Sequence, residues 1–299
     1  MSADVPHPAF EAYAAESIPQ SAVGSPGKEG KLELVFAATE DGTRLVHDFA
    51  RVPFHITGEL DNDPHPEGVG VCVQSPSGGV VQGDRQTVAV EIRDDAVAHV
   101  GTASAARIQS MDRNYAANTT RLSVGAGGHL DFVPEPTILH ADARYHSQCT
   151  LSLEENATAV VADVVVPGRL ARDEWFDFDR YYSELECRGP DGLLFTDTTH
   201  HRPGDVPDGP GELGAHAAYG TLYALIPAAD ADRLHQLARD ATDENTQAGA
   251  TRLPNEAGVL IRAVGDQAES VTDALHAAWE GARQTAIGAQ RPAGSGRAY

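Results

Sequence analysis

The 299 residues are 41% hydrophobic, and 44 acidic against 22 basic residues give a formal net charge of −22. This length and composition indicate a globular protein with one large core or two modest ones. The negative charge excludes the basic surface that nucleic acids need. No stretch approaches the roughly 18 apolar residues of a membrane span. We therefore expect neither nucleic acid nor a membrane among the partners.

The N-terminal residues lack the basic and then apolar pattern of a secretion signal, so we expect a cytoplasmic protein. Its cysteines, Cys72, Cys149 and Cys187, are odd in number and widely spaced, which is typical of reduced thiols. The acidic excess is typical of halophilic proteins, because a Debye length of about 3 Å at 1 M salt screens the charge repulsion. The alternative is an acidic surface made for a cationic partner.

The chain is predicted to begin with a flexible tail over residues 1–27, which are rich in Pro, Ala and Ser without periodicity. Alternating apolar residues predict a strand over 31–36, and Asp41-Gly42 predicts a hairpin turn into a strand over 43–49. The proline-containing stretch 62–68 is predicted to be a loop.

A strand–turn–strand pattern then occurs three times, over residues 88–100, 120–133 and 149–165. The turns lie about thirty residues apart, at Asp94-Asp95, Gly125–Gly128 and Glu155-Asn156. Such a recurrence predicts stacked layers in which each layer covers the open face of the one before. A plain meander of hairpins would also produce this echo, so periodicity alone leaves both arrangements open.

The pattern changes after Pro167-Gly168. The predicted elements that follow are strands over 176–187, 193–199, 219–226 and 259–264, helices over 229–242 and 270–287, a loop over 201–214 and a flexible tail over 291–299. The predicted fold is mainly β, a superhelical, β-helix-like stack of strands in layers, with two α-helices near the C-terminus. We expect a single domain over 28–290, whose helix-containing part covers about 216–290.

The thirteen histidines raise the alternative of a metal-dependent β-fold enzyme. Its tightest candidate groups are His140, His146 and Cys149, and the pair His200-His201. On one continuous strand, His140 and His146 share a face because they are an even number of residues apart, and Cys149 points away. The sequence contains no HExxH motif and no paired CxxC motif. The other interpretation is that these residues are ordinary polar residues on strand faces and at the tip of a loop.

No catalytic residue is predicted, because no serine lies in a G-x-S-x-G elbow and GGVVQGD matches neither phosphate-binding glycine motif. Gly78, Gly79 and Gly83 are expected in tight turns that need a positive φ or close backbone approach. Charged residues beside these and later turns often pair to fix loop geometry. They are Asp84, Arg85, Arg107, Arg169, Arg172, Asp173 and Glu174.

Several motifs resemble the urease accessory protein family called UreD or UreH, over roughly residues 30–288. The motifs are GKLELVF (30–36), SPSGGVVQGDR (75–85), TASAARIQSM (102–111), LDFVPEPTILHADARY (130–145), VVPGRLARDE (165–174), GVLIRAVG (258–265) and the helix carrying Trp279 and Arg283. Arg107 stands where the family usually has lysine. Asp173-Glu174 replaces the usual Gly-Glu, and the tryptophan common before the GR motif is missing.

The resemblance implies a β-rich, non-enzymatic scaffold with a superhelical stack of strands and two helices. It also implies that the protein binds apo-urease and a helical partner, UreF, and engages the nickel-carrying GTPase UreG through UreF. An internal passage through UreD and UreF is thought to lead Ni²⁺ to the urease active site. A purely structural adaptor without an ion path is the alternative within this family.

An ion in transit must be held loosely, at several weak sites, or it never leaves. Carboxylates, carbonyls and water bind Ni²⁺ more loosely than imidazole and thiolate do. We therefore expect no tightly bound cofactor, and buried acids beside the signature turns are the candidates to line a passage: Asp84, Glu135, Asp142 and Glu174. Asp84, Glu135 and Glu174 are also candidates for weak, transient contact with Ni²⁺.

Overall fold

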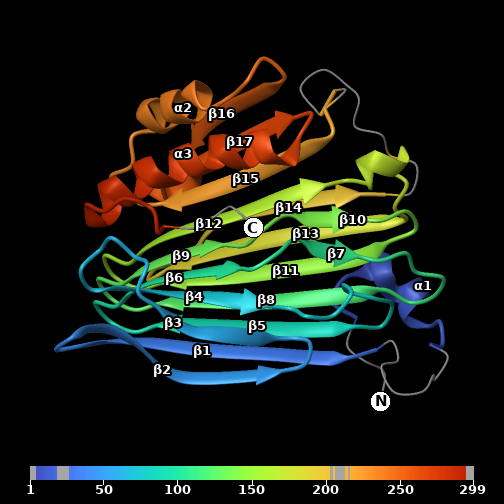
Figure 1. The fold of residues 1–299 in the computed structure, drawn as a ribbon, viewed down its shortest axis with the longest axis horizontal. Helices are drawn as coiled ribbons and strands as arrows, with labels where there is room; N and C mark the ends of the chain where they lie inside the picture. The colour runs from blue at the N-terminus through green and yellow to red at the C-terminus, as the bar shows by residue number, and fades with distance from the viewer. Residues whose placement is uncertain (1–4, 19–26, 203–204, 206–212, 215, 294–299) are drawn as a thin grey trace.

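Strands are the main secondary structure of this protein, whose computed structural model describes residues 5–18, 27–202, 205, 213–214 and 216–293 (Figure 1). The strands are β1 (Glu29–Thr39), β2 (Gly42–Arg51), β3 (His55–Leu60), β4 (Gly68–Gln74), β5 (Arg85–Ile92), β6 (Val97–Thr102), β7 (Ala106–Ile108), β8 (Ala116–Val124), β9 (His129–Val133), β10 (Thr137–Leu139), β11 (Arg144–Leu153), β12 (Thr158–Val166), β13 (Arg180–Gly189), β14 (Gly192–His201), β15 (Ala218–Leu225), β16 (Thr246–Arg252) and β17 (Val259–Gly265). The helices are α1 (Glu11–Ala14), α2 (Ala231–Asp240) and α3 (Ala268–Ile287), with short 3-10 segments η1 (Pro8–Phe10), η2 (Leu170–Arg172) and η3 (Pro254–Glu256).

The strands form two facing sheets, between which the chain alternates. The first sheet has the order β14-β13-β11-β8-β5-β1-β2, and the main path of the second is β16-β17-β15-β12-β9-β6-β4-β3. From β4 to β13 successive long strands alternate between the two sheets. Neighbouring strands within each sheet run parallel. Each sheet-to-sheet circuit therefore stacks on the previous one, which confirms the predicted β-helix-like layers (Figure 1).

The three predicted turns join the sheets at one end of successive circuits. Asp95, Gly127 and Asn156 occupy equivalent places there, with φ of 57°, 69° and 57°. Asp, Asn and Gly tolerate this left-handed conformation best. The turns also bond to one another, since Asp95 donates its N–H to the Ala126 carbonyl at 2.9 Å and Gly127 to that of Glu155 at 3.0 Å. The repeat of about thirty residues in the sequence therefore corresponds to a stack of equivalent turns in the structure.

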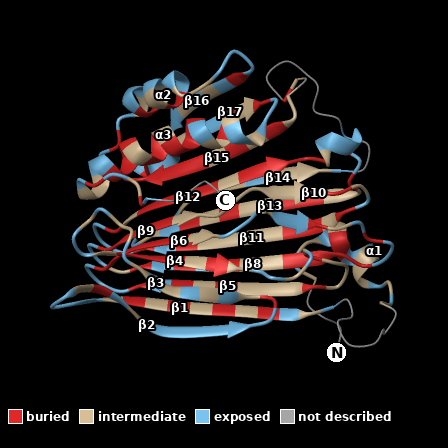
Figure 2. Cartoon of the chain, viewed as in Figure 1, coloured by how far each residue is buried: buried red, intermediate tan, exposed pale blue. Residues whose placement is uncertain are grey.

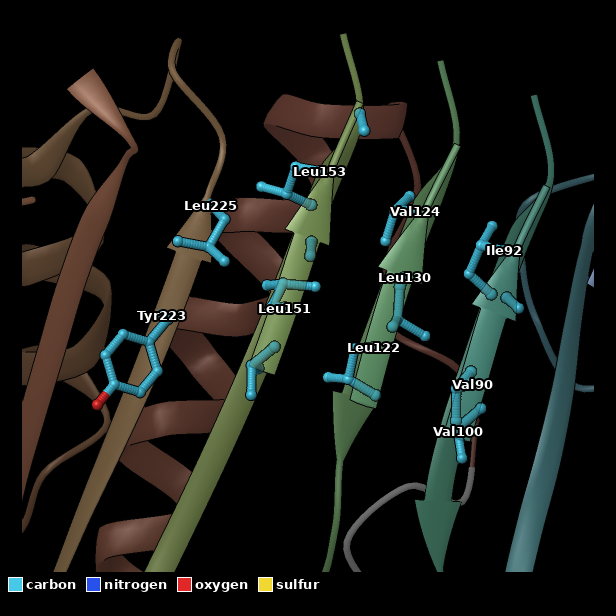
Figure 3. Packing of buried hydrophobic residues seen from close by; sticks show 14 of the residues in the cluster. Val90, Ile92, Val100, Leu122, Val124, Leu130, Leu151, Leu153, Tyr223 and Leu225 are labelled. Atoms are coloured by element: carbon cyan, nitrogen blue, oxygen red, sulfur yellow. The ribbon is translucent and has the colours of Figure 1, made fainter. Parts of the chain in front are cut away.

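Beside these turns the space between the sheets is filled by aliphatic side chains. In the first sheet Val90, Leu122 and Leu151 lie in register across β5, β8 and β11. The second sheet contributes Val100 and Leu130, and Figure 3 shows these side chains packed together. Burying each such side chain stabilises the fold by about 1.5–3 kcal/mol, so this end of the stack is a hydrophobic core.

Both predicted helices near the C-terminus are present, and they cover the outer face of the second sheet. Alternate residues of β12, Val160, Ala162 and Val164, pack in one cluster with Leu222 of β15 and Leu275 of α3. The intervening residues of β12 point between the sheets. Both faces of β12 are therefore buried, whereas β2 at the opposite edge of the stack is largely exposed (Figure 2).

Part of the predicted N-terminal tail is packed against the body, contrary to expectation. Residues 1–4 and 19–26 lie outside the described residues, but Phe10 in η1 is fully buried beside Tyr115 and His146. Glu16 accepts hydrogen bonds from the Asn114 N–H at 2.7 Å and the Arg144 guanidinium at 3.0 Å. The composition of this segment predicted a flexible tail, but one buried aromatic residue, Phe10, and one ion pair, between Glu16 and Arg144, hold it against the body. In the described residues, no helix is long and apolar enough to cross a membrane.

Candidate functional site: a polar cavity between the sheets

A cavity of about 270 Å³ lies between the two sheets. One wall is a row of polar side chains that crosses the first sheet in register: Gln86, Asn118, Ser147, Ser183 and Thr199. Because residues two apart on a strand share a face, these positions point the same way as the core residues that follow them. Each strand thus places polar residues at the cavity and aliphatic residues near the tight turns.

The opposite wall comes from the second sheet and contains the carboxylate of Asp163. Asp163 on β12 lies beside Thr221 of β15 in the strand register, and both line the cavity with Thr102, Tyr219 and Tyr223. Sequence reasoning missed Asp163. A single acid in the apolar strand TAVVADVVV, at a position that alternation directs inward, was the signal available.

Asp163 shares the cavity lining with three other carboxylates, Glu135, Glu184 and Asp197, and has few partners of its own. The Tyr181 hydroxyl donates a hydrogen bond to Asp163 Oδ2 at 3.3 Å, and the ion pairs among the described residues do not include this carboxylate. Burial raises the pKa of Asp163 from 3.8 to about 6. Asp163 keeps some accessible surface although it lies deep in the protein, because that surface faces the cavity.

The groups around Asp163 stay protonated at neutral pH. Burial, reinforced by the negative charge of Asp163, raises the pKa values of Tyr145, Tyr181 and Tyr219. Burial also raises the pKa of the Cys149 thiol to about 12, with smaller contributions from Cys187 and Asp163. A thiol is a much weaker metal ligand than a thiolate, so Cys149 does not make the cavity a strong metal site.

The raised pKa of Asp163 predicts a pH-dependent stability penalty. A folded-state pKa of about 6, above the ordinary 3.8, means that stability is highest below pH 3.8 and is lost as the pH rises through 6. Replacing Asp163 with Asn should therefore increase the free energy of unfolding at pH 7–8 by about 1–3 kcal/mol and leave it unchanged near pH 4. Urea unfolding of parent and variant at both pH values measures this, and an equal change at both would contradict it.

The rim of the cavity brings together two of the signature segments. Residues 77–80 and 104–107 are the corners of successive circuits, and the Val80 N–H donates to the Arg107 carbonyl at 2.8 Å. Gly79 has a φ of 126°, and a Cβ there would lie 2.5 Å from that same carbonyl oxygen. The Arg107 side chain is exposed at the rim.

Gly79 and Gly78 offer a matched pair of substitutions. Gly79→Ala should lower the free energy of unfolding by about 1–3 kcal/mol, because it combines a strained φ with a close contact. Gly78→Ala should have little effect, since its Cβ would meet nothing within 4 Å. Thermal unfolding of the two variants tests the difference, and equal melting temperatures would show that the rim adjusts without cost.

Glu135 also lies at the cavity, on a further signature segment, residues 130–145. Its N–H donates to the Thr102 hydroxyl at 2.8 Å, and burial raises the pKa of its half-buried carboxyl group. Among the acids selected from the sequence, Glu135 is the one that lines the cavity.

Asp84 and Arg85 have structural partners away from the cavity lining. Asp84 is buried, but its carboxylate accepts the N–H groups of Lys28 at 2.9 Å and Val81 at 3.0 Å. Arg85 donates to the Tyr115 carbonyl at 2.6 Å and stacks on that ring. Gly83, with a φ of 79°, lies in the same turn. These residues fix the loop that leads into β5.

The pairing expected for the arginine–carboxylate cluster after β12 is also present. Glu174 accepts hydrogen bonds from Nε and Nη2 of Arg169, which lowers the pKa of its carboxyl group. Asp142 was predicted to be buried, and this is wrong: it is exposed, at a turn with a φ of 58°. Asp is favoured at such positions for conformational reasons. Neither Glu174 nor Asp142 lines the cavity.

The two histidines of the metal-enzyme alternative do not share a strand face. His140 follows β10, whereas His146 lies in β11, stacked on Tyr182 with ring centroids 5.1 Å apart. The turn between the two strands breaks the assumed alternation. Cys149 does point away from His146, into the cavity, as predicted. Within the described residues, no group of three His, Cys, Asp or Glu side chains could hold a metal ion.

The histidine pair on β14 contacts polar partners rather than forming a cluster of ligands. His200 lies 3.0 Å from an Arg180 nitrogen, and His201 lies 3.3 Å from the Tyr219 hydroxyl. Burial lowers the pKa values of both histidines.

A second polar group, fully buried, joins α3 to the second sheet. Arg283 donates to Asp131 Oδ2 at 2.5 Å and to Asp63 Oδ1 at 2.7 Å, and Trp279 donates to Asp131 Oδ1 at 2.6 Å. Burial alone would raise the pKa of Asp131, but His129 and Arg283 hold it at about 2. Sequence reasoning singled out Trp279 and Arg283 by resemblance and missed their two acidic partners.

Comparison with known proteins gives one family. The family model of the UreD urease accessory protein matches residues 28–295. The chain is 58% identical to the urease accessory protein UreD of Haloarcula marismortui, with all of both chains covered. It is 43% identical to the UreD of Natronomonas pharaonis, over 95% of this chain and 97% of that one. It is 34% identical to UreD 2 of Brucella suis, over 91% and 93% respectively.

Proposed function

Because this chain belongs to the UreD urease accessory protein family, we propose that it acts without catalysis of its own, as an assembly factor that helps insert nickel into urease. The observation that carries the nickel part is the polar row from Gln86 to Thr199, which crosses successive strands between two otherwise apolar sheets. Burying polar side chains between two sheets costs free energy. We therefore infer that the aligned polar row has a function.

The chemistry of the cavity suits an ion in transit. Its described lining offers hydroxyls, amides and carboxylates, and in protonated form Cys149 does not compete as a thiolate. Such oxygen ligands hold Ni²⁺ less tightly than imidazole or thiolate would. Several weak positions in sequence let an ion enter and leave, whereas one tight site would trap it.

The proposed partners are apo-urease, UreF and, through UreF, the GTPase UreG, and the proposed compartment is the cytoplasm. The proposed partners rest on the family resemblance, and the proposed compartment rests on the sequence-based expectation. The net charge of −22 is consistent with a protein that functions at high salt concentration, and it does not favour binding to nucleic acid. The acidic surface also makes isolated exposed carboxylates poor candidates for specific roles.

Deletion of the gene tests the proposed function. A deletion strain should make urease polypeptide in normal amounts, but the purified urease should lack nickel and activity. Metal analysis of that urease, with the strain complemented by the parent gene as control, separates a loading defect from poor expression. Normal nickel content without the gene, at ordinary nickel levels, would rule out this function.

The metal-dependent enzyme alternative makes a different prediction for the histidines. Because His140 and His146 lie apart, the double variant His140→Asn/His146→Asn should still support urease activation. A well-folded double variant that fails to activate urease would favour the enzyme interpretation. The purely structural adaptor differs from a passage in its response to blocking the cavity, because an adaptor needs no open path.

A further inference from the structure

The strand β2 forms an open edge of the first sheet. Among the described strands it pairs with β1 alone, and Figure 2 shows it exposed along most of its length. Other segments close the start of this edge, where Glu59 accepts the Leu45 N–H at 2.7 Å and the Glu67 carbonyl accepts the Thr43 N–H at 2.9 Å. Within the described residues, the main chain of residues 46–50 has no hydrogen-bond partner other than β1. Its outward N–H and C=O groups can therefore pair with another strand.

The open part of β2 and the residue after it also carry exposed apolar side chains. Of the five large apolar side chains that are exposed in the described part of the chain, three lie here: Val46, Phe49 and Val52, with 49%, 44% and 67% of their surface accessible. They are evenly spaced, three residues apart, with Phe49 in the middle. Apolar side chains on an open edge favour the addition of a further strand.

The charges of β2 give little basis for choosing a partner of opposite charge. Arg44 forms an ion pair with Glu59 at 3.5 Å, and Arg51 forms one with Glu29 at 3.2 Å. Both arginines are therefore compensated within the chain. What β2 offers to a partner is its apolar pattern, and because that pattern is symmetric about Phe49, an identical strand running in the opposite direction matches it.

We propose that two copies of this chain associate through β2, as antiparallel strands related by a twofold axis at Phe49; this inference does not depend on the proposed function. In this register Phe49 lies opposite Phe49 of the second copy, and Val46 and Val52 lie opposite each other. The two first sheets then join into one continuous sheet. The interface is at the end of the stack away from α2 and α3 (Figure 1).

The neighbouring registers are less favourable. An axis one residue earlier places Asp48 directly opposite Asp48 of the second copy, and like charges in that position are destabilising. An axis one residue later places Val52 opposite Asp48, so an apolar side chain meets a carboxylate. Only the axis at Phe49 pairs the three exposed apolar residues with one another.

The association should be weak and should strengthen with salt. One strand pair with three apolar contacts is small beside the roughly 1,200–2,000 Å² that stable complexes bury. Each copy carries a net charge of −22, and raising KCl from about 0.1 M to about 1 M shortens the Debye length from about 10 Å to about 3 Å. Sedimentation velocity of the purified full-length chain should therefore show more dimer at the higher salt concentration, and less dimer there would contradict the proposal.

Phe49→Asp tests the central contact. It places two carboxylates opposite each other at the twofold axis, so it should raise the dissociation constant of the dimer about tenfold or more. Leu193→Asp is the matched control, because Leu193 is exposed on β14, the edge strand at the other end of the first sheet, and this variant should associate like the parent. Both side chains are exposed, so both variants should keep the fold, which urea unfolding checks.

Cysteine cross-linking tests the register while keeping Phe49. Asp48 lies opposite Ala50 of the second copy, whereas two Asp48 residues lie diagonally, farther apart than the about 3.5–4.5 Å between Cβ atoms that a disulfide requires. An oxidised mixture of Asp48→Cys and Ala50→Cys chains should therefore form linked dimers, and each variant alone should form no more than the parent does. A parent that stays monomeric at every salt concentration, an equal loss of dimer in Leu193→Asp, or equal cross-linking by Asp48→Cys alone would overturn the proposal.

Discussion

Replacing Arg283 with Met should lower the free energy of unfolding by about 3–5 kcal/mol, because it leaves buried carboxylates without their cation. The side chains of Arg283, Asp131 and Asp63 are completely enclosed, and the arginine bridges the other two. Met preserves much of the volume, so a cavity explains little of the loss. Urea or thermal unfolding in concentrated KCl measures the change.

Arg233→Met is the control for this experiment. Arg233 lies on α2 and donates to the Gln284 side chain of α3 at 3.1 Å, but in an exposed position. Exposed polar contacts contribute about 0–1 kcal/mol, so this variant should unfold almost like the parent. If both variants lost a similar amount of unfolding free energy, the buried network would contribute no more than an exposed contact to holding α3 on the sheet.

Replacing Ser147 with Phe should abolish nickel loading of urease if ions pass through the cavity. Ser147 is the middle residue of the polar row, with Asn118 and Ser183 beside it in the strand register. An aromatic ring there fills space that water and ions would need and replaces a hydroxyl with an apolar surface. The measurements are the nickel content and activity of urease from cells that carry the variant.

The adjacent residue provides the matched control. Gln148 on the same strand points to the opposite face, where it donates to Glu184 at 3.4 Å. Gln148→Phe adds a comparable ring outside the cavity and should leave loading intact. Both variants must still associate with apo-urease and UreF. Full activation by a folded Ser147→Phe variant would refute the passage and favour the purely structural adaptor.

The layered fold could be predicted because it has a local cause that repeats. Residues that tolerate a left-handed conformation recur at Asp95, Gly127 and Asn156, between alternating strands. Two elements were harder to predict for reasons of sequence. The strand β16 (TQAGATR) has small and polar residues with no apolar alternation, so its pairing with β17 depends on tertiary context. In the N-terminal segment, one buried aromatic residue, Phe10, decides the packing.

By itself, the sequence determined the repeat, the turn chemistry, the class of the fold and the family. It did not determine which acids face the interior, because that depends on strand register and on which partners the register brings near. Asp84 is satisfied by the N–H groups of Lys28 and Val81, and Glu174 is satisfied by Arg169 in its own loop. Asp142 is exposed, and Glu135 reaches the rim. Only the stacking of parallel strands in register aligns Ser147 with its polar neighbours and directs Asp163 toward them. The cavity forms only where several circuits align, because its lining residues come from different circuits and no single circuit contains them all.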